Sequence, residues 1–105
     1  DDYPDFIIPC AKAVSLDSTS KGIIIGGSGQ GEAIAANRIK KVRAAVYYGG
    51  PEDIVKLSRE HNDANVLCLP GRFMQFDDAW AIVKTFLKTP FSNEERHMKR
   101  LEMFK

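Results

Sequence analysis

The sequence predicts an α/β protein, a three-layer αβα Rossmann-like sandwich built around a parallel sheet. Three short runs, residues 22–27, 43–48 and 65–69, are apolar almost throughout and show no polar–apolar alternation. Continuous apolar runs of this length are typical of strands that are covered on both faces. Helical patterns lie between the runs, and strands that alternate with helices form layered parallel sheets with right-handed crossovers.

Five stretches with apolar residues at helical spacing are expected to be helices. They are residues 3–16, 30–40, 51–61, 77–87 and 93–104. Pro4 suits the start of the first helix, and Asp77 is expected to cap the fourth. That fourth helix, with Trp80 and Phe86, is expected to be mostly core or interface. The residues expected on the shared face of the third helix and the inward side of the fifth are Ile54, Leu57, Ser58, His61, Met98, Leu101 and Phe104.

Length and charge limit the classes of protein that fit. A chain of 105 residues suits one domain, residues 1–105, but three parallel strands make a narrow sheet and the chain opens on a helix. We therefore expect an N-terminal strand–helix unit to be missing, so that the chain is the C-terminal portion of a longer one. A net charge of +1, with acids and bases interspersed, argues against a nucleic-acid partner.

Other sequence signals concern location and metals. No apolar run approaches the roughly 20 residues of a membrane span, and no signal peptide is visible. Cys10 and Cys68 form neither a disulfide framework nor a metal-ligand spacing. We expect both to be buried free thiols in a cytoplasmic protein that has no metal site and no membrane partner.

A glycine-rich loop, Gly26-Gly27-Ser28-Gly29-Gln30-Gly31-Glu32, follows the first strand and opens a helix. A tight turn without a ligand is the simplest interpretation, but four glycines in six residues exceed what a turn needs. A dinucleotide fingerprint needs Gly or Ala at position 32, and a P-loop needs Lys there. Glu32 fails both patterns, which argues against a nucleotide-binding domain.

Glu32 is compatible with a different chemistry. An acidic residue in a first helical turn is often there for the helix dipole alone. Beside converging N–H groups, however, a carboxylate can remove a proton next to a carbonyl while the donors stabilise the resulting enediolate. The loop therefore indicates either a plain helix start or a site for enolisation.

The same loop is one of several motifs that resemble type B ribose-5-phosphate isomerases. The motifs are Gly-Gly-Ser-Gly-Gln-Gly-Glu-x-Ile-Ala-Ala-Asn at 26–37, Arg-Glu-His-Asn-Asp-Ala-Asn-Val-Leu at 59–67, Leu-Pro-Gly-Arg at 69–72, Thr-Pro-Phe at 89–91 with Arg-His-x-x-Arg at 96–100, and Asp-Tyr-Pro-Asp at 2–5. They stand in family order and cover essentially the whole chain. The resemblance implies a Rossmann-like isomerase of ribose 5-phosphate that works through an enediolate without metal or organic cofactor.

The resemblance also assigns roles to residues. It implies Glu32 as the base, Ser28 as the hydroxyl that assists proton handling, and His61 as the group that opens the sugar ring. One branch of the family uses a cysteine just before the loop, where this chain has Gly26 or Gly27. The residues expected to bind substrate are Tyr3, Gly27, Gly29, Gly31, Asn62, Arg72, Arg96 and Arg100, the last two of which lie four apart on one helix face to hold a phosphate. Arg72 is expected to serve the partner subunit of a homodimer or tetramer with shared sites.

Two departures from the family leave alternatives open. The usual N-terminal strand with its Asp-His-Ala-Gly motif is absent, and Tyr47-Tyr48-Gly49-Gly50 replaces a Cys-His-Asp type ending near the substrate. The chain is therefore expected to be an isomerase of ribose 5-phosphate, with an isomerase of six-carbon sugar phosphates or a non-catalytic sugar-phosphate binding module as the alternatives. His97 receives no role.

Overall fold

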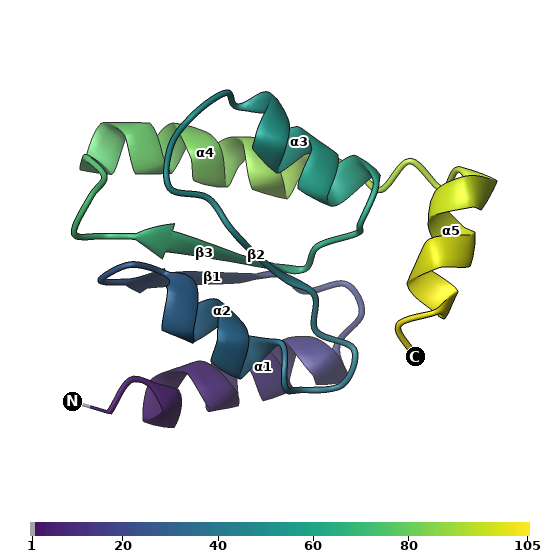
Figure 1. Ribbon diagram of the computed structural model, residues 1–105, viewed down its shortest axis with the longest axis horizontal. Coiled ribbons are helices and arrows are strands. Elements are labelled where there is room, and N and C mark those ends of the chain that lie inside the picture. The colour runs from purple at the N-terminus through teal and green to yellow at the C-terminus, as the bar shows by residue number, and fades with distance from the viewer. Residues whose placement is uncertain (1) are drawn as a thin grey trace.

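The computed structural model describes residues 2–105, and within them the chain forms three strands and five helices. In chain order they are α1 (Pro4–Leu16), β1 (Gly22–Gly26), α2 (Gln30–Ala36), β2 (Ala44–Val46), α3 (Asp53–Glu60), β3 (Val66–Pro70), α4 (Phe76–Lys88) and α5 (Glu95–Glu102). The strands form a parallel sheet of order β1-β3-β2. Helices α1 and α2 cover one face and α3 and α4 cover the other, so the predicted three-layer sandwich is confirmed (Figure 1).

The central strand β3 is buried along its whole length. It pairs with β1 from Gly22 opposite Val66, and with β2 from Ala44 opposite the same residue. Apolar side chains fill both faces of the sheet. Beneath α1 and α2 the core contains Ile7, Ala11, Val14, Ile24, Ala33, Ala36, Val42, Val66 and Cys68. Beneath α3 and α4 it contains Tyr47, Val55, Ala64, Leu67, Leu69, Ile82, Val83 and Phe86.

Two predicted helix boundaries were wrong. Helix α2 ends at Ala36, because the Asn37 side chain makes two hydrogen bonds with the backbone of Ala44, at 2.7 and 3.0 Å. These bonds hold the start of β2 and leave residues 37–41 as turns. Asp77 does not cap α4: the cap position is Gln75, in extended backbone, and Asp77 lies in the first turn.

The predicted faces of two helices were also wrong. The buried residues of α3 are Val55 and Arg59, whereas Ile54 and Leu57 are exposed. The buried residue of α5 is His97. On that helix Met98 lies exposed, as does Phe104 beyond its end, and Leu101 is half-buried. In α4, Phe86 is core whereas Trp80 is half exposed. The sequence pattern failed in α3 and α5 because a polar side chain occupies the inward position of each.

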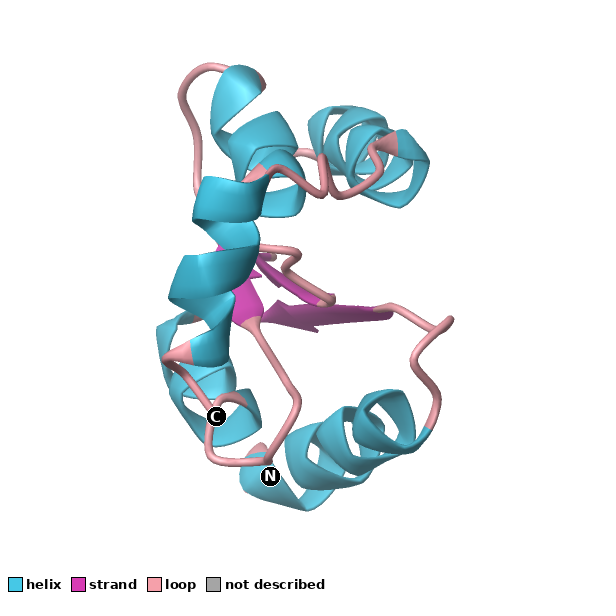
Figure 2. Ribbon diagram, turned by 90° about the vertical axis from the view of Figure 1, so that its right-hand side faces the viewer, coloured by secondary structure: helices cyan, strands magenta, loops and turns pink. Residues whose placement is uncertain are grey.

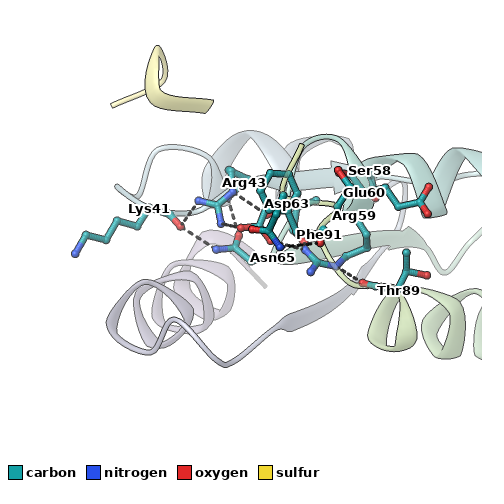
Figure 3. Close-up of polar contacts among 12 residues, drawn as sticks. Lys41, Arg43, Ser58, Arg59, Glu60, Asp63, Asn65, Thr89 and Phe91 are labelled. Carbon is teal, nitrogen blue, oxygen red and sulfur yellow. Dashed lines mark hydrogen bonds and ion pairs between the residues drawn. The ribbon is translucent and has the colours of Figure 1, made fainter. Parts of the chain in front are cut away.

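Arg59 is the polar anchor beneath α3, with only 5% of its surface exposed. Its guanidinium donates to the carbonyl of Thr89 at 2.9 Å, to the carbonyl of Ala64 at 2.6 Å and to the carboxylate of Asp63 at 2.8 Å (Figure 3). It also lies 5.8 Å from the ring centre of Phe86. Arg59 therefore joins the end of α3, the approach to β3 and the end of α4.

Helix α5 stands apart from the other helices, at the end of the sheet where the strands begin (Figures 1 and 2). The connection to it is held by Ser92, whose N–H and hydroxyl both donate to the carbonyl of Glu60, at 3.1 and 2.7 Å. The loops that follow the strands lie at the opposite end of the sheet. Among residues 2–105, no helix is both long enough and apolar enough to span a lipid bilayer.

Candidate active site

Glu32 lies in the first turn of α2, and its side chain folds back over the end of β1. A β-carbon built on Gly26 would collide with the Glu32 carboxylate and would stand 2.9 Å from its Cγ. The residue as a whole is only 8% exposed. Strand β1 therefore ends in glycine at the point where the acid needs room, and the carboxylate is held against the loop.

The loop itself is fixed by backbone geometry. Gly29 has φ of +79°, a left-handed conformation that glycine adopts without strain, and it begins α2. The N–H of Gln30 donates to the hydroxyl oxygen of Ser28 at 3.2 Å. The carbonyl of Gly26 accepts from the N–H of Gly71 at 2.6 Å, and the carbonyl of Gly27 accepts from the backbone N–H of Arg72 at 3.2 Å. The loops after β1 and β3 thus form one rigid rim around Glu32.

Two further predicted residues lie against this rim. A β-carbon on Gly27 would stand 3.2 Å from a terminal nitrogen of Arg72, so the guanidinium covers that glycine. A β-carbon on Gly31 would collide with the Tyr3 hydroxyl and stand 2.8 Å from the ring carbon that bears it. Arg72 thus contacts the glycine loop of its own chain, and its contact with a partner subunit stays a prediction. Glu32, Ser28, the three loop glycines, Tyr3 and Arg72 are together at one end of the sheet.

Cys68 lies under this rim in β3, completely buried. Burial, together with the smaller effects of the nearby charges of Glu32 and Cys10, raises the pKa of its thiol to about 12. Both cysteines are free, although Cys10 is only half-buried rather than fully buried as expected.

The other predicted residues are not in this place. His61 ends α3, and Asn62 follows it, at the end of the sheet where β3 begins. Arg96 and Arg100 are exposed on α5, beside the same end (Figures 1 and 2). A five-residue strand is about 13 Å long. Within one chain, His61 and the arginine pair are therefore too far from Glu32 to contact the same atom of a small ligand.

Sequence reasoning missed two residues that the structure brings into view. Gly26 was treated only as part of a glycine-rich loop, whereas it provides the space for the Glu32 carboxylate. His97 was left without a role, whereas it is buried and its ring stacks on that of His61. A histidine in the charged sequence Glu94–Arg100 gives no hydrophobic signal, so periodicity could not find it.

Two other features bear on what could bind. A hollow of ≈ 400 Å³ lies beside the end of β2, and Tyr47, Tyr48, Gly49, Gly50 and Phe73 contribute to its lining. The Tyr47 hydroxyl donates to the carbonyl of Gly50 at 2.5 Å, which shapes this loop. Among residues 2–105, no group of three or more His, Cys, Asp or Glu side chains is arranged to hold a metal ion.

A buried carboxylate over a glycine loop, at the carboxyl end of a parallel sheet, defines a Rossmann-like protein with a candidate site where such folds bind their ligands. Residues 1–104 match the family described as Ribose/Galactose Isomerase, and the chain belongs to that family. It is 41% identical over 103 residues to "Ribose-5-phosphate isomerase B" of Mycolicibacterium paratuberculosis, covering 98% of this chain and 64% of that protein. The predicted family resemblance is confirmed.

Solved structures agree with this assignment. The type B ribose 5-phosphate isomerase of Trypanosoma brucei superposes with a TM-score of 0.93 at 41% identity, covering 100% of this chain and 69% of that one. Ribose-5-phosphate isomerase B of Mycoplasma genitalium, solved with bound ribulose-5-phosphate, gives a TM-score of 0.90 at 41% identity, with 98% and 66% covered. The chain spans a little under two thirds of the length of the mycobacterial relatives, from 62% to 64%.

Proposed function

We propose that this protein is an aldose–ketose isomerase that interconverts ribose 5-phosphate and ribulose 5-phosphate through an enediolate, with Glu32 as the base. The observation that carries the proposal is the position of the Glu32 carboxylate, covered and held over Gly26 beside the loop of Ser28 and Gly29. The Mycoplasma genitalium relative with bound ribulose-5-phosphate supports this class of substrate.

The proposed chemistry needs one base and a set of hydrogen-bond donors. Glu32 removes the proton from C2 of the open-chain aldose, and the electron pair forms the C1–C2 double bond while O1 becomes negative. Backbone N–H groups of Gly27, Gly29 and Gly31 stabilise this oxygen, as in other sites for developing anions. Ser28 passes the hydroxyl proton from O2 to O1, and Glu32 returns its proton to C1. These proposed reaction steps use neither a metal ion nor an organic cofactor.

Ring opening and phosphate binding are assigned to the other end of the sheet of a second copy. His61, with Asn62 beside it, protonates the ring oxygen, a step that suits an imidazole near neutral pH. Arg96 and Arg100 of the same copy bind the phosphate dianion with their guanidinium forks. Because one chain keeps these groups about a strand length from Glu32, the proposal requires a homodimer, alone or within a tetramer. Tyr3 and Arg72 contact the sugar phosphate from the Glu32 side.

The decisive experiment measures isomerase turnover of the Glu32→Gln variant in the full-length protein. Glutamine keeps the size of the side chain but cannot accept the C2 proton, so turnover of ribose 5-phosphate should fall by about 10³-fold or more. Binding of ribose 5-phosphate, measured by calorimetry, should stay within a few fold. Turnover close to that of the unaltered protein would remove Glu32 from the base role.

Six-carbon sugar phosphates are the second candidate substrates, because the matched family includes galactose isomerases in its description. The loop of Tyr48 and Gly49 beside the hollow at β2 is where a longer sugar would need room. Comparing kcat/KM for ribose 5-phosphate, allose 6-phosphate and galactose 6-phosphate decides between them. Binding without turnover of any of these would instead indicate a non-catalytic sugar-phosphate module. The free thiols Cys10 and Cys68 fit a cytoplasmic location, where thiols stay reduced.

A further inference from the structure

His61 and His97 form a stacked pair of imidazole rings between α3 and α5. Their ring centres are 4.1 Å apart and their planes differ by 19°. His61 is the residue at which α3 ends, and His97 lies in the first turn of α5. The pair therefore connects the end of one helix to a helix that otherwise stands apart from the body of the fold.

His97 is the buried partner, with 3% of its surface exposed. Its Nε2 lies 3.1 Å from a carboxylate oxygen of Glu94, but within residues 2–105 no group meets hydrogen-bond geometry with this nitrogen. Burial lowers the pKa of His97, as do the charges of His61, Arg96 and Arg100, whereas Glu94 raises it. A neutral ring that carries little hydrogen bonding is held mainly by packing, and here it packs against His61.

The geometry points to His97 as a positioning residue. Its ring fixes the plane of the His61 imidazole and holds that imidazole at a constant position relative to Arg96 and Arg100 on α5. This inference rests on the proposed function, in which His61 opens the sugar ring. His97 lies between Arg96 and Arg100 in sequence, on the same short helix. One rigid helix therefore presents the phosphate-binding pair and, through the stack, sets the position of the ring-opening imidazole.

The two substrates of the proposed reaction make this role measurable. Ribose 5-phosphate is mostly a closed ring and must be opened, whereas ribulose 5-phosphate cannot close a five-membered ring because its O5 carries the phosphate. Exchange of the C1 protons of ribulose 5-phosphate with D₂O therefore needs Glu32 but not ring opening. Loss of His61 alignment should slow aldose conversion while leaving this exchange intact.

The experiment compares both rates, at saturating substrate, in His97→Ala, in His97→Phe and in a matched control, Lys99→Ala, which changes an exposed residue of the same helix. For His97→Ala we expect kcat for conversion of ribose 5-phosphate to fall by about tenfold, since small misplacements of catalytic groups have effects of that order or larger. The exchange kcat should stay within about twofold of the unaltered protein. His97→Phe, which keeps a flat ring, should restore conversion, and Lys99→Ala should change neither rate.

Each contrary outcome overturns the inference. Equal losses of conversion and exchange in His97→Ala would show that the residue has only a structural role. Unchanged conversion, or a His97→Phe variant as slow as His97→Ala, would show that stacking does not position His61. The proposed function fails separately: Glu32→Gln should abolish conversion and exchange together, and if exchange persists in that variant the base has been misassigned whatever His97 does.

Discussion

The carboxylate of Glu32 occupies the space that a β-carbon on Gly26 would require. The two residues are six positions apart, one ending β1 and the other in the first turn of α2. A side chain at position 26 and a carboxylate folded over that position exclude each other. The observed conformation of Glu32 therefore requires glycine at position 26.

Gly26→Ala should therefore inactivate the protein while leaving it folded. The added methyl group meets only the far end of a flexible side chain, and Gly26 is not among the residues with positive φ. We expect the carboxylate to swing out, lowering kcat for ribose 5-phosphate by about 100-fold, because the base loses its alignment. The free energy of unfolding, from urea titration, should change by less than about 1.5 kcal/mol.

The double variant Gly26→Ala with Glu32→Gln is the matched control for this prediction. Residues that act through one interaction show non-additive effects. The double variant should be no slower than Glu32→Gln alone. If the two losses multiply instead, Gly26 acts on catalysis by a route other than making room for Glu32.

If sites are shared between two copies, as proposed above, two inactive variants should complement each other. Glu32→Gln and His61→Asn each spoil both sites of a homodimer, but a mixed dimer has one site with both groups intact. Random reassembly of equal amounts gives about half mixed dimers, and so about a quarter of the turnover of the unaltered protein. Measuring isomerase activity before and after co-refolding provides the check.

Absence of any gain would contradict the shared site. In that case the loss of activity in His61→Asn would have to arise without contact between His61 and the sugar at Glu32, because within one chain the sheet separates them by about the length of β3, roughly 13 Å. The single variants, mixed without refolding, are the control for contaminating activity.

The sequence was sufficient to predict the strands and the glycine loop, because each of these features has a local sequence pattern. A fully covered strand such as β3 must be apolar at every position, and Val66–Pro70 is buried throughout. Gly29 needs its positive φ to turn the chain into α2. Short-range rules of this kind do not depend on what the rest of the chain does, so they transfer directly from sequence to structure.

Two other features depend on longer-range geometry. They are the buried faces of α3 and α5, and the separation of the predicted site residues between the two ends of the sheet. Arg59 and His97 are buried because partners such as the Thr89 carbonyl and the His61 ring come from elsewhere in the fold, and hydrophobic periodicity ignores such pairs. The separation of His61 from Glu32 was nevertheless foreseeable. A helix that follows one parallel strand must return to the starting end of the next, and so His61 at the end of α3 lies away from the loop.

Arg59 is predicted to dominate the stability of the α3–α4 side. Arg59→Met keeps most of the side-chain bulk but leaves the carbonyls of Ala64 and Thr89 without this donor, and leaves the Asp63 carboxylate with Arg43 alone. Loss of a buried charged donor with several acceptors costs about 3 kcal/mol. The free energy of unfolding from urea titration should fall by that amount, and the transition should stay cooperative.

Lys105→Ala is the comparison for Arg59. Lys105 pairs with Glu102 at 2.8 Å, but both side chains are mostly exposed. Exposed pairs contribute about 0–1 kcal/mol, so this variant should be nearly neutral. If Arg59→Met were as mild as Lys105→Ala, the hydrogen bonds around Arg59 would not be a main support of the fold.

Cys68 should make the folded state sensitive to alkali. Burial, reinforced by the charge of Glu32, raises the pKa of its thiol to about 12 in the folded state, above the ordinary value of 9.0. Between these two values the folded protein keeps a proton that the unfolded chain releases, so stability from this residue is present below pH 9 and is lost as the pH rises towards 12. Urea titrations at pH 8 and pH 10.5 should show a smaller drop in the free energy of unfolding for Cys68→Ala than for the unaltered protein, even though the variant is less stable at both pH values.

The reactivity of Cys68 provides a second measurement. At pH 8, iodoacetamide should leave Cys68 unmodified, as judged by mass spectrometry, until urea unfolds the chain, because the thiolate is the reactive form. An equal pH dependence in the two proteins, or rapid labelling of native Cys68, would show that the thiol is neither deeply buried nor close to Glu32.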